Sequence, residues 1–120
     1  MFHSNSETHP WLQIKLEAER MIEGVVIVNR KKDWGQRLAN LEIRAGNSPL
    51  PYRYSGYEQI DINTVGGFFE GPGASDETYE IKFDTPIRAN FITLQQLNSK
   101  YLQIVEVYLP GGEFFQTYCV

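Results

Sequence analysis

The chain contains very little of the chemistry from which disulfides and metal sites are built. Its one cysteine, Cys119, has no second thiol to pair with in the 120 residues. An internal disulfide and a cysteine-rich zinc site are therefore both excluded. The two histidines, His3 and His9, lie six positions apart. This is neither the i, i+4 spacing of a helical metal-binding pair nor the alternation of a strand pair.

The chain also lacks segments that would bring it to a membrane or to nucleic acid. No stretch approaches the roughly 18 apolar residues that cross a bilayer, which predicts a soluble domain with no transmembrane segment. The net charge is −4 and no block of like charge is longer than the "RKK" of residues 30–32, so nucleic acid is not an expected partner. The opening "MFHSNSETHP" has neither the basic region nor the apolar core of a signal peptide. We expect either an intracellular domain or one cut from a longer secreted chain.

Motifs typical of enzymes are missing as well. There is no Gly-x-Ser-x-Gly elbow, and the glycine-rich "GGFFEGPG" lies between strands, without the helix that a phosphate-binding loop needs. Glu70, Asp76 and Glu77 share one loop but form no matched acid and base. The sequence therefore predicts a protein that is not an enzyme.

What the chain does contain is a series of short segments with a hydrophobic period of two. Alternation of this kind, with turn-forming residues between the segments, predicts β-strands. Seven to nine strands spaced about ten residues apart indicate an all-β, antiparallel sandwich or jelly roll, and the absence of repeats and linkers predicts one domain over residues 1–120. A helix over residues 34–43 is the alternative considered, but this stretch is short and uncapped, and reads better as a loop followed by a strand. The expected strands are 11–16, 21–29, 41–46, 77–84, 89–97, 101–109 and 113–120, with breaks at 17–20, 47–51, 66–77, 85–86, 97–100 and 109–112.

The most informative loop is "NRKKDWGQR", residues 29–37, which follows an apolar run. Arg30 and Arg37 could point at one spot, where their guanidinium forks would suit paired acceptors such as the vicinal hydroxyls of a sugar. Trp34 could offer its ring to the apolar side of that sugar. The alternative is that both arginines pair with surface carboxylates and that Trp34 caps the core.

These residues resemble the discoidin-like domains of the galactose-binding fold (F5/8 type C), and among them the F-type, fucose-binding lectins. The motif of that family is a histidine, twenty-six residues, an arginine and a second basic residue seven further on. His3, Arg30 and Arg37 have this spacing. The Pro-Trp at positions 10–11 and the segment "NFITLQQLNSKYLQIVEVY" are also similar to the family, so that the resemblance covers residues 2–108.

The resemblance implies a sugar site in which His3, Arg30 and Arg37 donate hydrogen bonds to a terminal fucose-like sugar. The family has an orienting aspartate two positions after the first arginine. Here that position holds Lys32, and we expect Asp33 to take over the role. Adjacent cysteines that often pack on the sugar in the family are replaced by Asp33 and Trp34, so Trp34 is expected to supply the apolar contact.

The resemblance also implies a structural calcium ion, because "VEVY" matches a segment that gives it a backbone carbonyl and a glutamate. The corresponding residues are Val105 and Glu106. We expect the strand and calcium-binding loop that usually precede the motif to be absent or replaced here. Because calcium takes six to eight oxygen ligands, a normal calcium site is then not expected. We expect the tail, residues 109–120, to supply a strand in the place of the missing one.

The predicted function is therefore a non-catalytic, lectin-like module that binds a terminal fucose- or galactose-like sugar on a glycan. A discoidin-type adhesion or protein-interaction module and an accessory domain of a larger enzyme are the alternatives. Because single sugar sites of this kind are weak, tandem domains or a homo-oligomer would normally be needed. The expected location is extracellular, as part of a longer secreted chain.

Overall fold

The fold is built from antiparallel strands joined by loops. The computed structural model describes residues 2–3, 9–29, 38–50, 59–97, 103–104, 106–110 and 117–118, with side chains described for 9–29, 38–50, 59–97 and 107–110. No helix occurs among these residues, and the predicted all-β, antiparallel class is confirmed. The strands are β1 (Phe2–His3), β2 (Trp11–Val28), β3 (Leu41–Gly46), β4 (Thr64–Phe69), β5 (Thr78–Gln96), β6 (Gln103–Ile104), β7 (Glu106–Tyr108) and β8 (Thr117–Tyr118).

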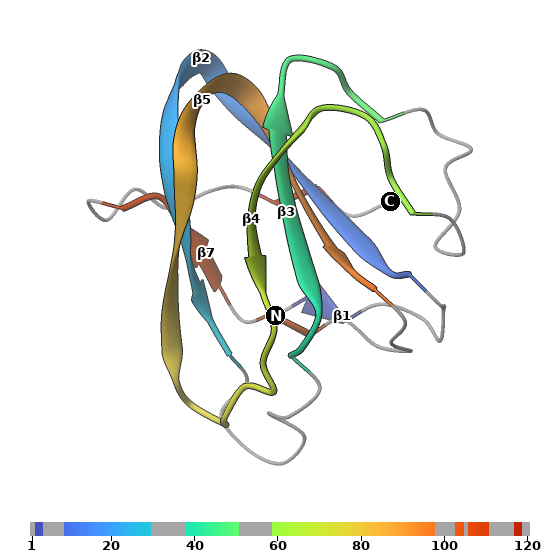
Figure 1. Ribbon diagram of the computed structural model, residues 1–120, viewed down its shortest axis with the longest axis vertical. Coiled ribbons are helices and arrows are strands. Elements are labelled where there is room, and N and C mark those ends of the chain that lie inside the picture. The colour runs from blue at the N-terminus through green and yellow to red at the C-terminus, as the bar shows by residue number, and fades with distance from the viewer. Residues whose placement is uncertain are drawn as a thin grey trace.

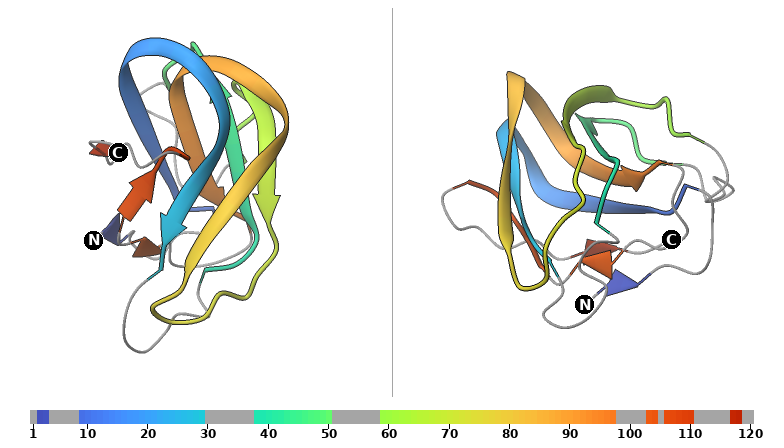
Figure 2. Two further views of the ribbon diagram at one scale, coloured as in Figure 1. Left: turned by 90° about the vertical axis from the view of Figure 1, so that its left-hand side faces the viewer. Right: turned by 60° about the horizontal axis from the view of Figure 1, so that its bottom comes forward.

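Two long strands, β2 and β5, run side by side through both layers of the sandwich (Figure 1). Their register begins at Trp11 opposite Gln95 and ends at Val28 opposite Thr78. The strand order is β4-β3-β5-β2-β7, with β8 also on β2. One layer contains β3, β4 and β8 with the first half of β2 and the second half of β5; the other contains the remaining halves and β7. Both views in Figure 2 show how the two long strands bend from one layer into the other.

The core between the layers follows from the alternation in the sequence. The side chains that face inward are aliphatic or aromatic and fully or nearly fully buried, among them Leu12, Ile14, Ile22, Ile27, Leu41, Ile43, Phe83, Ile92 and Leu94. Burial of one such side chain contributes about 1.5–3 kcal/mol. This shared core holds the strand ends, from which the loops project.

Two of the predicted breaks are wrong, because the chain bends at these places and does not end a strand. Residues 17–20 lie inside β2, and residues 85–86 lie inside β5. The register shifts between Lys15 and Arg20 and again between Ile22 and Gly24, as in a β-bulge, which bends a strand and increases its twist. Pro86 falls in the second irregular stretch, where the missing N–H of a proline is tolerated.

The predicted break at 66–77 concealed a strand, since its first four residues belong to β4. Gly66 and Gly67 lie against the other layer: a Cβ atom on Gly66 would come within 2.6 Å of the Phe83 ring, and one on Gly67 within 3.0 Å of the Ile81 side chain. The two glycines therefore allow close packing of the layers. Glycine pairs are typical of turns, so the sequence predicted a break here. The close packing of the two layers leaves no local signal in the sequence.

The C-terminal tail does supply a strand, as expected. In β8, Tyr118 pairs with Gln13 and Thr117 pairs with Ile14. The tail thus adds to the free side of β2 in the first layer. This pairing covers part of an edge that would otherwise be open.

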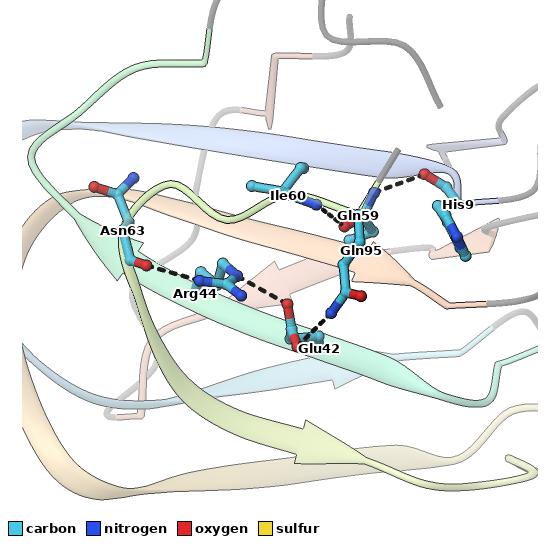
Figure 3. A network of polar contacts seen from close by, with 7 residues as sticks. All are labelled: His9, Glu42, Arg44, Gln59, Ile60, Asn63 and Gln95. Atoms are coloured by element: carbon cyan, nitrogen blue, oxygen red, sulfur yellow. Dashed lines mark hydrogen bonds and ion pairs between the residues drawn. The ribbon is translucent and has the colours of Figure 1, made fainter. Parts of the chain in front are cut away.

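The side of the first layer that faces away from the core is unusually polar. Gln13, Glu42, Thr93 and Gln95 are at most 9% exposed. Residues 59–63, directly before β4, lie over Glu42 and Gln95 (Figure 3). The amide nitrogen of Ile60 donates to Gln95 Oε1 at 2.7 Å, and that of Leu50 donates to Gln13 Oε1 at 3.3 Å. The side-chain amides of Gln95 and Gln13 thus hold the chain that covers this face through hydrogen bonds, where apolar contacts would otherwise be needed.

Arg44 completes this polar layer. Its Nε atom donates to Glu42 Oε1 at 2.8 Å, and its Nη1 atom donates to the backbone oxygen of Asn63 at 2.8 Å (Figure 3). Both side chains of the ion pair are mostly buried, with 14% of Arg44 and 11% of Glu42 exposed. The arginine is therefore engaged in the fold and is not offered to a ligand.

Candidate functional site

Most of the predicted sugar-binding residues lie outside the part of the chain that the structure describes. His3 lies in β1, where only its backbone is described. Arg30, Asp33, Trp34 and Arg37 lie outside the described residues. Their roles, and the competing interpretation of surface pairing and core capping, stay predictions. The structure does describe the strands and turns next to the two chain segments that carry these residues.

The strand register brings these two segments to the same end of the molecule. His3 in β1 pairs with Gln103 in β6, and β7 follows β6 along the chain. In β7, Glu106 pairs with Val28, which is the last residue of β2 and two positions before Arg30. The views in Figure 2 agree, with β1 and β6 beside the C-terminal end of β2.

Asn29 fixes the start of the loop at residues 30–37, which we call the arginine loop. It follows β2 directly, is only 1% exposed, and donates from Nδ2 to the backbone oxygen of Ala74 at 2.9 Å. Its backbone nitrogen donates to the oxygen of Glu77 at 3.0 Å. The arginine loop therefore begins directly after a residue that is held by two hydrogen bonds to a single turn, residues 70–77.

The same turn fixes the end of the arginine loop. Leu38, the first described residue after it, is 2% exposed, and its backbone oxygen accepts from Gly73 at 2.7 Å. Gly71 has a positive φ of 71°, and a Cβ atom there would lie 2.6 Å from that oxygen. Only glycine fits both demands, because other residues are strained at such a φ and would clash here.

The turn itself is braced from within. The hydroxyl of Tyr79 accepts a hydrogen bond from the backbone nitrogen of Ala74 at 2.7 Å. The Tyr79 ring packs on Phe69 with centroids 4.6 Å apart. We refer to residues 70–77, held by Asn29, Leu38 and Tyr79, as the clamp turn. The sequence identified residues 66–77 as a loop but gave no indication that this loop would meet both ends of the arginine loop.

Residues 9–10, directly before β2, are also anchored. Gln95 Nε2 donates to the backbone oxygen of His9 at 2.9 Å (Figure 3). The backbone nitrogen of Gln96 donates to the backbone oxygen of Pro10 at 2.9 Å. Gln95 is 2% exposed and thus serves both His9 and Ile60 from inside the polar layer. Sequence reasoning missed Gln95, although a glutamine in an apolar strand is a usable signal for a buried hydrogen-bonding role.

The structure gives no support to a metal centre in its described part. Glu106 lies in β7 with only its backbone described, so its predicted contact with calcium is untested. Across the residues with described positions, no group of three or more histidine, cysteine, aspartate or glutamate side chains could hold a metal ion. Glu70, Asp76 and Glu77 are exposed on the clamp turn, where Glu77 contributes its backbone oxygen. Within the described ranges we also find no helical segment with the length and hydropathy needed to cross a membrane.

Comparison with known proteins agrees with the predicted fold and family. Residues 1–107 match the F5/8 type C domain family. Fucolectin-5 of Anguilla japonica is 28% identical over 105 residues, which cover 88% of this chain and 51% of the relative. The crystal structure of an F-lectin (fucolectin) from the serum of striped bass, Morone saxatilis, superposes with a TM-score of 0.73 at 23% identity. That match covers 94% of this chain and 34% of the lectin. The chain thus spans about half the length of the curated relative and a third of the solved lectin.

Proposed function

Since the chain belongs to the F5/8 type C domain family, we propose that it is a non-catalytic carbohydrate-binding module for a terminal fucose- or galactose-like sugar. His3, Arg30 and Arg37 donate to the ring oxygen and hydroxyls of the sugar. Trp34 covers its apolar side, and Asp33 orients the arginines. The similarity to two fucolectins supports this choice over an adhesion module or an enzyme accessory domain.

The observation that carries the proposal is the anchoring of both ends of the arginine loop by one turn. Asn29 and Leu38 are nearly fully buried and are bonded to the clamp turn at distances of 2.7–3.0 Å. A loop of eight intervening residues that served only to carry surface charge would not require such fixed ends. Fixed ends limit the conformations of Arg30 and Arg37, which lowers the entropy lost when they close on a ligand.

The chemistry of the donors suits a neutral sugar. Each guanidinium offers a planar fork of N–H groups that matches two neighbouring oxygens, and a neutral imidazole can donate through one nitrogen. Hydrogen bonds from charged donors contribute about 1.5–3 kcal/mol each. Three such donors and one stacked ring are enough for a weak, specific site, and we infer that several sites together provide useful avidity.

The partner is accordingly a glycan or glycoconjugate, and the place of action is extracellular. The striped bass lectin comes from serum, which is consistent with this location.

A glycan array tests the proposal directly. Wild type is compared with the double variant Arg30→Ala plus Arg37→Ala, and with Arg20→Ala plus Arg88→Ala as the matched control. The control removes the same charge from exposed positions on the bend of β2 and β5. We expect wild type and control to bind fucosylated or galactosylated glycans, and the first variant to lose about 100-fold or more in affinity, at roughly tenfold per 1.4 kcal/mol. Folded wild type without any glycan signal, or a signal that survives the loss of both loop arginines, would refute the proposal.

A further inference from the structure

Tyr79 lies where the two layers of the sandwich meet the clamp turn. It is the second residue of β5, in the half that pairs with β2 and belongs to the second layer. Its ring packs on Phe69, the last residue of β4 in the first layer, with centroids 4.6 Å apart and ring planes inclined by 44°. Both side chains are partly buried against the core. The pair therefore joins the two layers at the end of the sandwich where the clamp turn connects β4 to β5 (Figure 1).

The arginine loop joins the same two layers. It begins after Asn29, directly behind the second-layer half of β2, and it ends before Leu38, which precedes β3 in the first layer. The distance between its two ends therefore depends on the spacing of the layers at this end of the molecule. The contact of Phe69 with Tyr79 helps to fix that spacing, because closely packed side chains resist displacement.

The hydroxyl of Tyr79 adds a second hold on the ends of the arginine loop. It accepts a hydrogen bond from the backbone nitrogen of Ala74 at 2.7 Å. The backbone oxygen of Ala74 accepts from Asn29 Nδ2 at 2.9 Å. The preceding residue, Gly73, donates from its backbone nitrogen to the oxygen of Leu38 at 2.7 Å. The hydroxyl thus holds the turn at the point where the bonds to both ends of the loop lie on adjacent residues.

The two ends of the clamp turn are held in a different way from its middle. Glu70 and Glu77 accept hydrogen bonds on their backbone oxygens, and these bonds extend the neighbouring strand ladders. Such bonds do not depend on the type of side chain. Residues 73–74, in the middle of the turn, are reached by the hydroxyl of Tyr79. The position of this middle part is therefore encoded in one side chain.

We propose that Tyr79 is a positioning residue for the arginine loop. Its ring spaces the two layers and its hydroxyl holds residues 73–74, so that the two ends of the loop keep a fixed separation. Arg30 directly follows one end and Arg37 directly precedes the other, so Tyr79 limits how far apart these two donors lie. Preset donors lose less entropy when they close on a ligand. The effect on sugar binding rests on the proposed function, whereas the effect on the ends of the loop does not.

Hydrogen exchange without sugar tests the positioning role directly. The variant Tyr79→Phe keeps a ring next to Phe69 and removes only the hydroxyl. We expect the backbone amide of Gly73, which bonds to Leu38, to exchange faster than in wild type by about tenfold or more. The amide of Gln96, which bonds to Pro10 at 2.9 Å, serves as the internal reference and should not change. Unchanged exchange at Gly73 would overturn the proposal.

Sugar affinity is compared with a matched control, Thr93→Val, which also removes a hydroxyl from β5. Thr93 is 1% exposed, and its Oγ1 atom accepts from Gln13 Nε2 at 3.2 Å in the polar layer. Thermal unfolding and calorimetric titration with free L-fucose are run on wild type and both variants. The control should lose more stability, because its hydrogen bond is buried, and should keep the affinity of wild type. Tyr79→Phe should lose affinity by about 5-fold or more, because the donors must be ordered on binding.

The two measurements separate failure of this proposal from failure of the proposed function. Wild type that binds no sugar refutes the function, while the exchange at Gly73 still decides whether Tyr79 holds the ends of the loop. If wild type binds, an unchanged affinity in Tyr79→Phe, or an equal loss in Thr93→Val, would show that the hydroxyl of Tyr79 only stabilises the fold. Either result would reject the positioning role.

Discussion

Replacing Asn29 with alanine should weaken sugar binding by more than it weakens the fold. The amide of Asn29 is buried, and it donates to Ala74 at 2.9 Å in the clamp turn. Alanine removes this hydrogen bond but keeps the backbone bond from residue 29 to Glu77 at 3.0 Å. The start of the arginine loop then loses one of its two described bonds to the turn.

The expected magnitudes follow from these contacts. Loss of one partly buried hydrogen bond costs about 1–2 kcal/mol, which lowers the melting temperature by about 4–8 °C. If Arg30 and Arg37 are no longer held, each must be ordered on binding at about 0.5–1.5 kcal/mol. The sum of about 1–3 kcal/mol corresponds to a 5- to 150-fold loss of sugar affinity.

Asn63→Ala is the control, because it removes side-chain hydrogen bonds at the other end of β3, far along the chain from the arginine loop. Asn63 Nδ2 donates to the backbone oxygen of Ser48 at 2.8 Å, and Asn63 Oδ1 accepts from the Ser48 nitrogen at 3.1 Å. Thermal unfolding and calorimetric titration with free L-fucose would be run on both variants. We expect Asn63→Ala to lose at least as much stability as Asn29→Ala, because alanine is also strained at the φ of 72° that Asn63 adopts, with affinity reduced only in Asn29→Ala. If Asn29→Ala binds like wild type, or Asn63→Ala loses affinity equally, the clamp turn does not position the arginines.

Two further predictions concern the arginine loop itself. Asp33→Asn should abolish sugar binding if Asp33 has taken over the orienting role, and Lys32→Asp in that variant should restore it; titration of both decides this, and unchanged binding by Asp33→Asn would exclude the role. Sugar should also change the tryptophan fluorescence of wild type but not of Trp34→Phe, because Trp11 is only 3% exposed and cannot reach the solvent; a response that persists in Trp34→Phe would remove Trp34 from the site.

Much of the fold could be predicted because it rests on local alternation. The inward positions of β2, β3 and β5 are apolar at every second residue over long stretches, and that pattern alone specifies half-buried strands. The same alternation identified the tail as a strand, and Thr117–Tyr118 do pair with β2. The spacing of His3, Arg30 and Arg37 is likewise a property of the sequence alone, and it led to the family that residues 1–107 match.

The errors arose where distant contacts reverse the local meaning of a residue. The polar segment at residues 17–20 and the proline at position 86 suggested breaks between strands. Both lie at bends inside continuous strands, because β2 and β5 bend together. The sequence predicts Gly66 and Gly67 in a loop, yet they belong to β4. Glycine is needed there because Phe83 and Ile81 leave no room for side chains. In each case the deciding atom is far away in sequence.

The sequence by itself determined the class of fold, the family and the set of donors that could bind a sugar, since periodicity and motif spacing are read along one chain. Only the tertiary structure decided that the clamp turn bonds to both Asn29 and Leu38, and that β4 is the outermost of the described strands on its side of the sheet. The physical reason is the same for both. Hydrogen bonds between loops and the exposure of a strand edge depend on which segments become neighbours after the layers pack, and the packing is set by the whole core.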